Sequence, residues 1–322
     1  MKYKILCLLL VMILTLSFCS CKVTSVDGKK EIAVIVKSVS SDFWHNVESG
    51  VNSAATEYNV SVTFEGPESE EDYIEQNNLI LKAIENKVDA IVLSAIDYDK
   101  NVAAVDKAAK EGIKIVTIDS NVNSENVSMF IGTDNANAGR DAAKAACKNF
   151  KRNEQINIGI VNYSRGTDNG RQREKGFTKY INSVDNAKIV GTVYVDSNVT
   201  SATAGAISLL NNHPEINVLV GFNEFMTLGV GNAINQGKLT NKVCGIGFDT
   251  NVKSIGMIET GEMDALIVQN SFAIGYLGVK NAADLIDGKD TENEIITDTY
   301  TITKQNLFDE DSQKILFHFQ VD

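Results

Sequence analysis

Polar side chains that can bind hydroxyl groups stand at the ends of successive apolar runs in this 322-residue sequence. A hydroxyl donates one hydrogen bond and accepts up to two, so a carboxylate on one side and an amide or guanidinium on the other satisfy it. The recurring acids, amides and arginines therefore indicate a site for a hydroxyl-rich small molecule. The positions are Ser40–Trp44, Asp97, Asp119, Ser120, Arg165–Arg171, Asp196–Asn198, Asn223, Glu224, Asp249 and Gln269.

Two large aromatic side chains, Phe43 and Trp44, lie next to each other where the first apolar run gives way to a helical pattern. Trp44 is the only tryptophan of the chain. Adjacent large aromatic residues seldom both face a core, so the pair is a candidate for contact with a ligand. The alternative is that one or both belong to the core.

The motifs that usually mark an enzyme or a metal site do not occur in the sequence. It has no P-loop, no HExxH, no nucleophile elbow and no CxxC or Cys/His cluster. Its three histidines are scattered. We therefore predict a protein that is not an enzyme and needs neither a cofactor nor a metal. The alternative is a pair of acids at strand ends acting as in a glycosidase.

Strand and helix patterns alternate along most of the chain. Near-continuous apolar runs are typical of parallel strands buried on both faces, and apolar residues at helical spacing separate these runs. The alternation predicts an α/β protein with two doubly wound, Rossmann-like lobes built on parallel sheets. Ligands of such sheets bind beyond the carboxyl ends of the strands, where the polar positions stand. The predicted strands are 31–38, 60–66, 88–96, 113–120, 156–164, 187–196, 216–223, 242–249 and 264–270, the helices are 43–59, 69–87, 98–112, 170–184, 200–214 and 224–237, and 128–150 combines a strand with a helix.

The N-terminus has the features of an export signal. A short basic start precedes twelve apolar residues, too few for a membrane span of about 20 residues but typical of a signal peptide. The following Ser20 and Cys21 resemble a bacterial lipobox. The pattern predicts a lipoprotein signal peptide over 1–20, a lipidated Cys21 and a polar tether over 21–30. Cleavage that releases a free secreted protein is the alternative.

The charge of the chain limits its partners. The formal net charge is −12, and no basic stripe stands out in the sequence. An acidic chain of this kind is not expected to bind nucleic acid.

Seven stretches are specific in their order and spacing, namely SSDFWHNVESG, VDAIVLSAID, IKIVTIDS, FIGTDNANAGRDAA, GRQREKGF, GFNEFMTLGV and GIGFD. Together they resemble the periplasmic sugar-binding proteins of ABC importers, in the ribose/galactose-binding (type I) branch. The resemblance extends from about residue 31 to residue 320.

The resemblance implies an architecture and a set of ligand-binding residues. The fold would be periplasmic binding protein-like I, with a three-stranded hinge. The aromatic pair would cover the faces of a sugar ring, and Arg171, between Asp119 and Asp249, would bind adjacent hydroxyls; the nearby Arg173 is the alternative arginine. The N-terminal lobe would comprise 31–133 and 270–300, and the C-terminal lobe 134–269 and 301–322. The implied ligand-binding residues are Ser41, Phe43, Trp44, Asp119, Arg171, Asn223, Asp249 and Gln269.

The implied function is that of a lipoprotein on the outer face of the cytoplasmic membrane, or in the periplasm, that delivers a monosaccharide or polyol to an ABC permease. Ser41, Ser120 and Ser197 replace larger residues of ribose binders, which favours a ligand other than ribose. One alternative is a sensor that binds a sugar or an autoinducer and docks on a sensor kinase or chemoreceptor. A sugar-responsive repressor shares the fold, but it would need a helix-turn-helix where the signal peptide stands.

Overall fold

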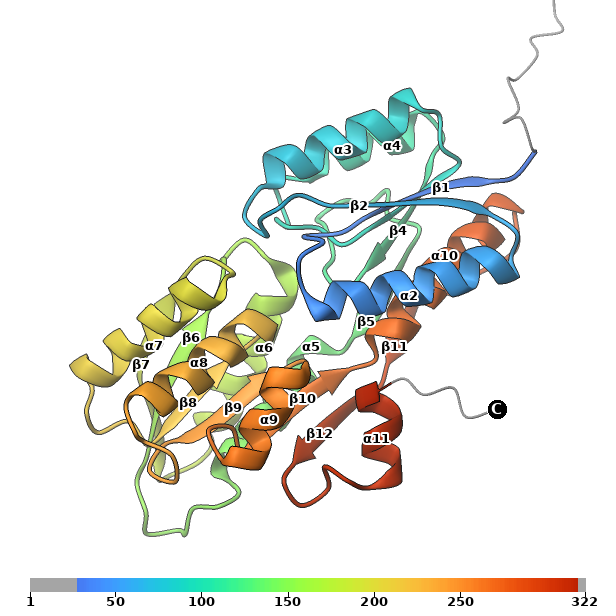
Figure 1. Cartoon of the computed structure of the whole chain (residues 1–322). Helices are drawn as coiled ribbons and strands as arrows, with labels where there is room; N and C mark the ends of the chain where they lie inside the picture. The colour runs from blue at the N-terminus through green and yellow to red at the C-terminus, as the bar shows by residue number, and fades with distance from the viewer. Residues whose placement is uncertain (1–27, 318–322) are drawn as a thin grey trace, which may run out of the picture.

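A computed structural model of the protein describes residues 28–317. It shows two lobes, each with a six-stranded sheet between layers of helices (Figure 1). The predicted signal peptide, Cys21 and most of the predicted tether lie outside the described residues.

The first sheet is parallel throughout and belongs to the N-terminal lobe. Its residues alternate between two hydrophobic clusters: Ile32 and Val34 of the first strand pack on one face, whereas Ala33 and Ile35 pack on the other. This two-sided burial explains why the strand is a near-continuous apolar run. In spatial order the strands are β11 (Glu294–Thr297), β5 (Met129–Thr133), β4 (Lys114–Ile118), β3 (Ala90–Leu93), β1 (Glu31–Ile35) and β2 (Ser61–Glu65).

Two pairs of helices cover the first sheet. The helices α2 (Asp42–Glu57) and α10 (Ser271–Ile286) lie on one face, and α3 (Tyr73–Glu85) and α4 (Val102–Lys110) lie on the other. Figure 1 shows α2 and α10 on the side of the sheet opposite α3 and α4.

The second sheet repeats this plan in the C-terminal lobe, with one antiparallel edge strand, β12, which pairs with β10. Helices α5 and α6 pack together, as do α7 and α8, while α9 packs on α8 and α11 on β12. In spatial order the strands are β12 (Thr299–Thr303), β10 (Ala265–Gln269), β9 (Cys244–Phe248), β8 (Val218–Gly221), β6 (Ile156–Asn162) and β7 (Ala187–Tyr194). The helices are α5 (Asn135–Cys147), α6 (Asp168–Ile181), α7 (Val199–Asn212), α8 (Glu224–Gln236), α9 (Val252–Thr260) and α11 (Glu310–Phe317).

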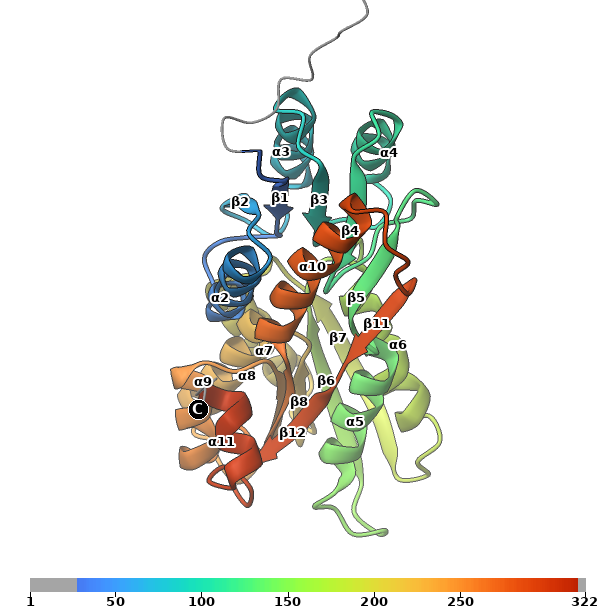
Figure 2. The same ribbon diagram turned by 90° about the vertical axis from the view of Figure 1, so that its right-hand side faces the viewer.

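The chain passes between the sheets three times. It leaves the first sheet after β5, returns from β10 to α10 against α2, and passes from β11 of the first sheet to β12 of the second across Asp298. Figure 2 shows β11 and β12 in line as one long path between the lobes.

The predicted fold class is confirmed: both sheets are mainly parallel and covered by helices. No pattern in the sequence predicted α9, β11, β12 or α11, and β12 runs antiparallel to its neighbour β10. Between residues 28 and 317, no helix combines the length and the apolar character that a membrane span requires.

Candidate ligand-binding site

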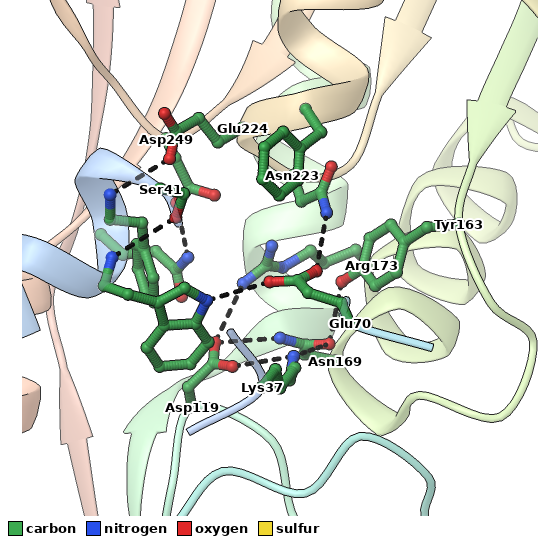
Figure 3. Close-up of a pocket in the computed structure, with 14 residues that line it drawn as sticks. Lys37, Ser41, Glu70, Asp119, Tyr163, Asn169, Arg173, Asn223, Glu224 and Asp249 are labelled. Atoms are coloured by element: carbon green, nitrogen blue, oxygen red, sulfur yellow. Dashed lines mark hydrogen bonds and ion pairs between the residues drawn. The ribbon is translucent and has the colours of Figure 1, made fainter. Parts of the chain in front are cut away.

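A cavity lies between the two lobes, at the carboxyl ends of strands from both sheets. The empty space between its lining atoms, including the part open to solvent, is about 300 Å³. Figure 3 shows acids, amides and cations from both lobes converging on it. The cavity is lined by Lys37, Ser41, Phe43, Trp44, Glu70, Asp119, Tyr163, Asn169, Arg173, Asn223, Glu224, Phe225, Asp249 and Gln269.

Two aspartates take matching positions in the two lobes. Asp119 follows β4 and Asp249 follows β9, and both adopt the left-handed conformation, with φ of 56° and 63°. Each backbone amide donates to the neighbouring strand, at 3.0 Å to the carbonyl of Ile131 or Ile267. Aspartate tolerates this conformation better than most residues, and such strained positions concentrate at functional sites.

The negative charge of Asp119 is balanced by two nearby cations, Lys37 and Arg173. Lys37 Nζ lies 2.9 Å from its Oδ2, which also accepts from Ser94 Oγ at 3.0 Å. Its Oδ1 accepts from Asn169 Nδ2 at 2.9 Å. Burial by itself raises the pKa of Asp119, but Lys37 and Arg173 outweigh this effect and hold it below its ordinary value. Asp119 is therefore a carboxylate at neutral pH.

Arg173 places a guanidinium deep in the cavity. It is almost fully buried, its Nε donates to Asn135 Oδ1 at 2.8 Å, and its Nη1 donates to the carbonyl of Phe222 at 2.7 Å. Its plane also lies over the ring of Phe248, 4.7 Å from the centroid. Within the described residues Nη2 has no hydrogen-bond partner, and the nearest acid, Asp119 Oδ1, is 3.9 Å away. A buried donor without an acceptor is costly, so this nitrogen is positioned for a ligand.

The structure corrects the choice of arginine. Arg171 does not line the cavity: its side chain is 43% exposed, pairs with Asp168 at 3.2 Å and lies over the ring of Tyr98. Helical geometry explains the difference, because residues two apart on a helix point in nearly opposite directions. Arg173 shares a face with the buried Gly176 and Phe177, whereas Arg171 does not.

Close packing of α5 on α6 holds Arg173 in place. A Cβ atom at Gly139 would lie 2.0 Å from the carbonyl oxygen of Arg173, and one at Gly176 would lie 1.9 Å from that of Ala136. Only glycine permits such an approach of two backbones. The two helices therefore bring Asn135 of α5 next to the guanidinium of α6.

Asp249 is held in position by Gln269, which lies at the end of β10. Its Oδ1 accepts from Gln269 Nε2 at 2.7 Å, and Gln269 Oε1 accepts from Thr133 of the first sheet at 3.0 Å. Burial raises the pKa of Asp249 to about 6, although Arg173 and the Gln269 hydrogen bond lower it. Asp249 therefore remains incompletely compensated without a ligand.

The two predicted aromatic residues both line the cavity and also join the first lobe's core. Phe43 and Trp44 are buried and meet edge to face, with ring centroids 4.9 Å apart. The pair therefore combines a place in the core with a place at the cavity wall, and its contact with a ligand stays a prediction. Their position follows from the start of α2, where Ser41 caps the helix by accepting from Trp44 N at 3.4 Å.

Asn223 is also a helix cap. Its Oδ1 accepts from Met226 N at the start of α8, so its Nδ2 is directed elsewhere, to Ser197 Oγ at 2.8 Å. The acid next to it, Glu224, accepts from Phe43 N of the other lobe at 3.1 Å. A carboxylate at the positive N-terminus of α2 is favourable, and here it joins the lobes beside the cavity.

Seven of the eight predicted ligand-binding residues line the cavity, and Arg171 does not. Helical spacing could have identified Arg173. Lys37 could have been identified because it stands at the end of the first apolar run. The sequence holds no comparable signal for the side chain of Glu70, in a polar loop. The lining residues that the prediction omitted are Lys37, Glu70, Tyr163, Asn169, Arg173, Glu224 and Phe225. Among residues 28–317 no group of three or more His, Cys, Asp or Glu residues could hold a metal ion.

Comparison with known families settles the membership of the chain. The family model described as the periplasmic binding protein domain matches residues 32–290, well over half of the sequence. The chain belongs to this family. Membership in a family of binding proteins supports the prediction that the protein is not an enzyme.

This periplasmic binding protein has relatives in both bacterial sequences and solved structures. It is 27% identical over 268 residues to the D-allose-binding periplasmic protein of Escherichia coli K12, covering 81% of this chain and 86% of that protein. It is 25% identical to the ribose import binding protein RbsB of Bacillus subtilis, covering 85% and 88%.

Two solved structures extend the likeness. A carbohydrate transporter solute binding protein from Agrobacterium radiobacter, in complex with D-arabinose, superposes with a TM-score of 0.87 at 30% identity, covering 89% of this chain and 99% of that one. An ABC transporter solute binding protein from Agrobacterium vitis, with bound D-fucose, gives a TM-score of 0.85 at 34% identity, covering 89% and 100%.

Proposed function

We propose that this periplasmic binding protein closes on a monosaccharide or a related polyol in the interlobe cavity and delivers it to the permease of an ABC importer. The relatives support this function, because two are named for the binding or import of a sugar and the two solved structures contain a bound sugar. The proposed ligand-binding residues are Ser41, Phe43, Trp44, Asp119, Arg173, Asn223, Asp249 and Gln269.

The observation that carries the proposal is that Arg173 Nη2 finds no hydrogen-bond partner among residues 28–317, in a cavity that Asp249 also lines. A hydroxyl can accept a hydrogen bond from the guanidinium and donate one to the carboxylate. One diol could therefore supply hydrogen-bond partners to both Arg173 and Asp249. The indole of Trp44 offers an apolar surface to the C–H groups of a ring. A hydroxyl-rich ring therefore fits the cavity better than an apolar or strongly anionic molecule.

Closure would be driven by the ligand because it touches both lobes only when they are shut. Asp119 and Trp44 belong to the first lobe, whereas Arg173 and Asp249 belong to the second. A ligand that bonds both sets binds the closed state more tightly and shifts the population toward it.

A thermal-shift screen of neutral aldoses, ketoses and polyols tests the proposal, with amino acids as the matched negative set. We expect at least one sugar or polyol to raise the unfolding midpoint and to bind in calorimetry with a micromolar Kd, about −8 kcal/mol. Binding of amino acids only, or of no sugar or polyol, would contradict it.

The importer role is favoured over the sensor role, because relatives named for import cover most of the chain. Export to the periplasm follows from the same family. Deletion of the gene for this protein should abolish uptake of the sugar that the protein binds. Uptake that persists while a sugar response is lost would favour a sensor.

We further propose that the exported protein is anchored by a lipid on Cys21. The lipobox-like Ser20–Cys21 pair after an apolar run supports this proposal. In cells, Cys21→Ser should abolish the incorporation of a labelled fatty acid into the protein. Cys19→Ser is the matched control and should leave the labelling unchanged. Equal labelling of wild type and Cys21→Ser would refute the anchor.

A further inference from the structure

The loop between β2 and α3 joins the two lobes beside the cavity. Glu70 of this loop accepts from Ser197 Oγ at 2.7 Å through its Oε2. The next residue, Glu71, accepts from the backbone amide of the same serine. Ser197 lies between β7 and α7 of the C-terminal lobe, so both contacts cross the gap.

The Glu70 carboxyl also holds the tryptophan of the site. Its Oε1 accepts from Trp44 Nε1 at 2.9 Å, and Asn223 Nδ2 lies 3.5 Å from its Oε2. One carboxyl thus ties the indole of the first lobe to Ser197 and Asn223 of the second. Figure 3 shows Glu70 and Asn223 next to each other at the cavity. Because each oxygen already has a donor from the protein, Glu70 does not depend on a ligand for its hydrogen bonds.

The burial of Glu70 sets it apart from the other acids of its loop. It is 9% exposed, whereas Glu68 is exposed. A buried carboxyl is costly unless it is hydrogen-bonded, so the three donors account for its position. Burial raises its pKa against the opposing effect of Lys37, and Asp119 and Tyr163 also face it.

We propose that Glu70 is a positioning residue that orients Trp44 in the binding site and, together with Glu71, clasps Ser197 so that the closed arrangement is stabilised before a ligand arrives. Only the role of Trp44 rests on the proposed sugar function. The clasp itself consists of contacts between protein groups, so the two ideas can fail separately.

The clasp is tested on the ligand-free protein by single-molecule energy transfer between dyes on the two lobes. Loss of the interlobe hydrogen bonds should lower the closed-to-open ratio about fivefold in both Glu70→Ala and Ser197→Ala, which corresponds to about 1 kcal/mol, the usual net contribution of one hydrogen bond. Glu68→Ala, a change of the same type on the same loop, should leave the ratio unchanged. Equal closure in wild type and both clasp variants, or no closed population in wild type, would overturn the proposal.

The orientation of Trp44 has its own readout, because its indole is the only one in the chain. We expect Glu70→Ala to shift the tryptophan emission to longer wavelength, since the indole N–H loses its partner and meets water. Glu70→Gln keeps an oxygen acceptor and should restore most of the wild-type spectrum. An unshifted spectrum in Glu70→Ala would remove the positioning role, whether or not any sugar binds.

The pH response distinguishes the clasp from simple packing. The raised pKa of Glu70 means that the closed form binds a proton more tightly than an open form with this acid in water. Lowering the pH from about 7 to about 5 should therefore favour closure more in wild type than in Glu70→Gln. Asp249, whose pKa is about 6, titrates in this range in both proteins, so only the difference between them counts. Identical responses would contradict the burial of Glu70 on closure.

Discussion

Replacing Arg173 by methionine should weaken sugar binding at least about 100-fold, or about 2.7 kcal/mol, whereas Arg171→Met should change the affinity by less than about threefold. Methionine keeps the apolar stem of Arg173 but removes Nη2, which has no hydrogen-bond partner in the part of the chain that the structure describes. The two variants make the same chemical change two residues apart on α6, which makes Arg171→Met a matched control. Calorimetry with the sugar identified by the screen measures both.

Arg173→Met also loses the hydrogen bonds to Asn135 and to the carbonyl of Phe222. Urea unfolding must therefore show that the variant is folded at the temperature of the titration. Arg173→Lys provides a second variant, because it retains the charge next to Asp119 but not the fixed fork of donors. We expect lysine to recover stability more than affinity. Full affinity in Arg173→Met, or its loss in Arg171→Met, would place the arginine contact elsewhere.

Replacing Asp249 by asparagine should stabilise the ligand-free protein at pH 7 and at the same time remove most of its affinity for sugar. Burial raises the pKa of Asp249 from 3.8 to about 6, so the folded state at pH 7 holds an incompletely compensated carboxylate. At about 1.4 kcal/mol for each tenfold change in proton affinity, its cost is at most about 3 kcal/mol. Asparagine has nearly the same shape and also tolerates the φ of 63°.

The sign of the pH effect follows from the raised pKa. Stability from this group is fully present below its unfolded pKa near 3.8 and is lost as the pH rises through about 6. Wild type should thus lose stability between about pH 4 and pH 7 relative to Asp249→Asn, and the two should converge near pH 4. Urea unfolding across this range measures the difference. A wild type that is more stable than Asp249→Asn at pH 7 would contradict the raised pKa.

Asp249→Asn should lower the sugar affinity by about 10-fold to about 100-fold, since a charge-assisted hydrogen bond contributes about 1.5–3 kcal/mol. A gain of stability together with a loss of binding would identify Asp249 as a group kept for its ligand rather than for the fold.

Predicted residues that follow strands lie at the cavity because the strands fix their positions. Asp119 and Asp249 follow buried apolar strands, and parallel sheets bring such positions to one edge. The same rule locates Asn223 at the start of α8. The ligand contacts of these side chains stay predictions, but their presence around one cavity does not depend on a bound sugar.

The residues that the sequence misplaced or missed depend on finer geometry. The choice between Arg171 and Arg173 required the phase of α6, which the buried Gly176 and Phe177 reveal. Glu70 stands in a polar loop without periodicity, and its burial results from contact with the other lobe. The short β11 is partly exposed and follows a charged segment, so no apolar run marks it.

A crystal structure with the sugar selected by the screen would test the central claim most directly. We expect the ring between closed lobes, next to Trp44, with hydroxyl groups within hydrogen-bond distance of Arg173 Nη2 and the Asp249 carboxylate. A sugar bound outside the cavity, or one that contacts a single lobe and leaves both of these groups without a partner, would contradict the account.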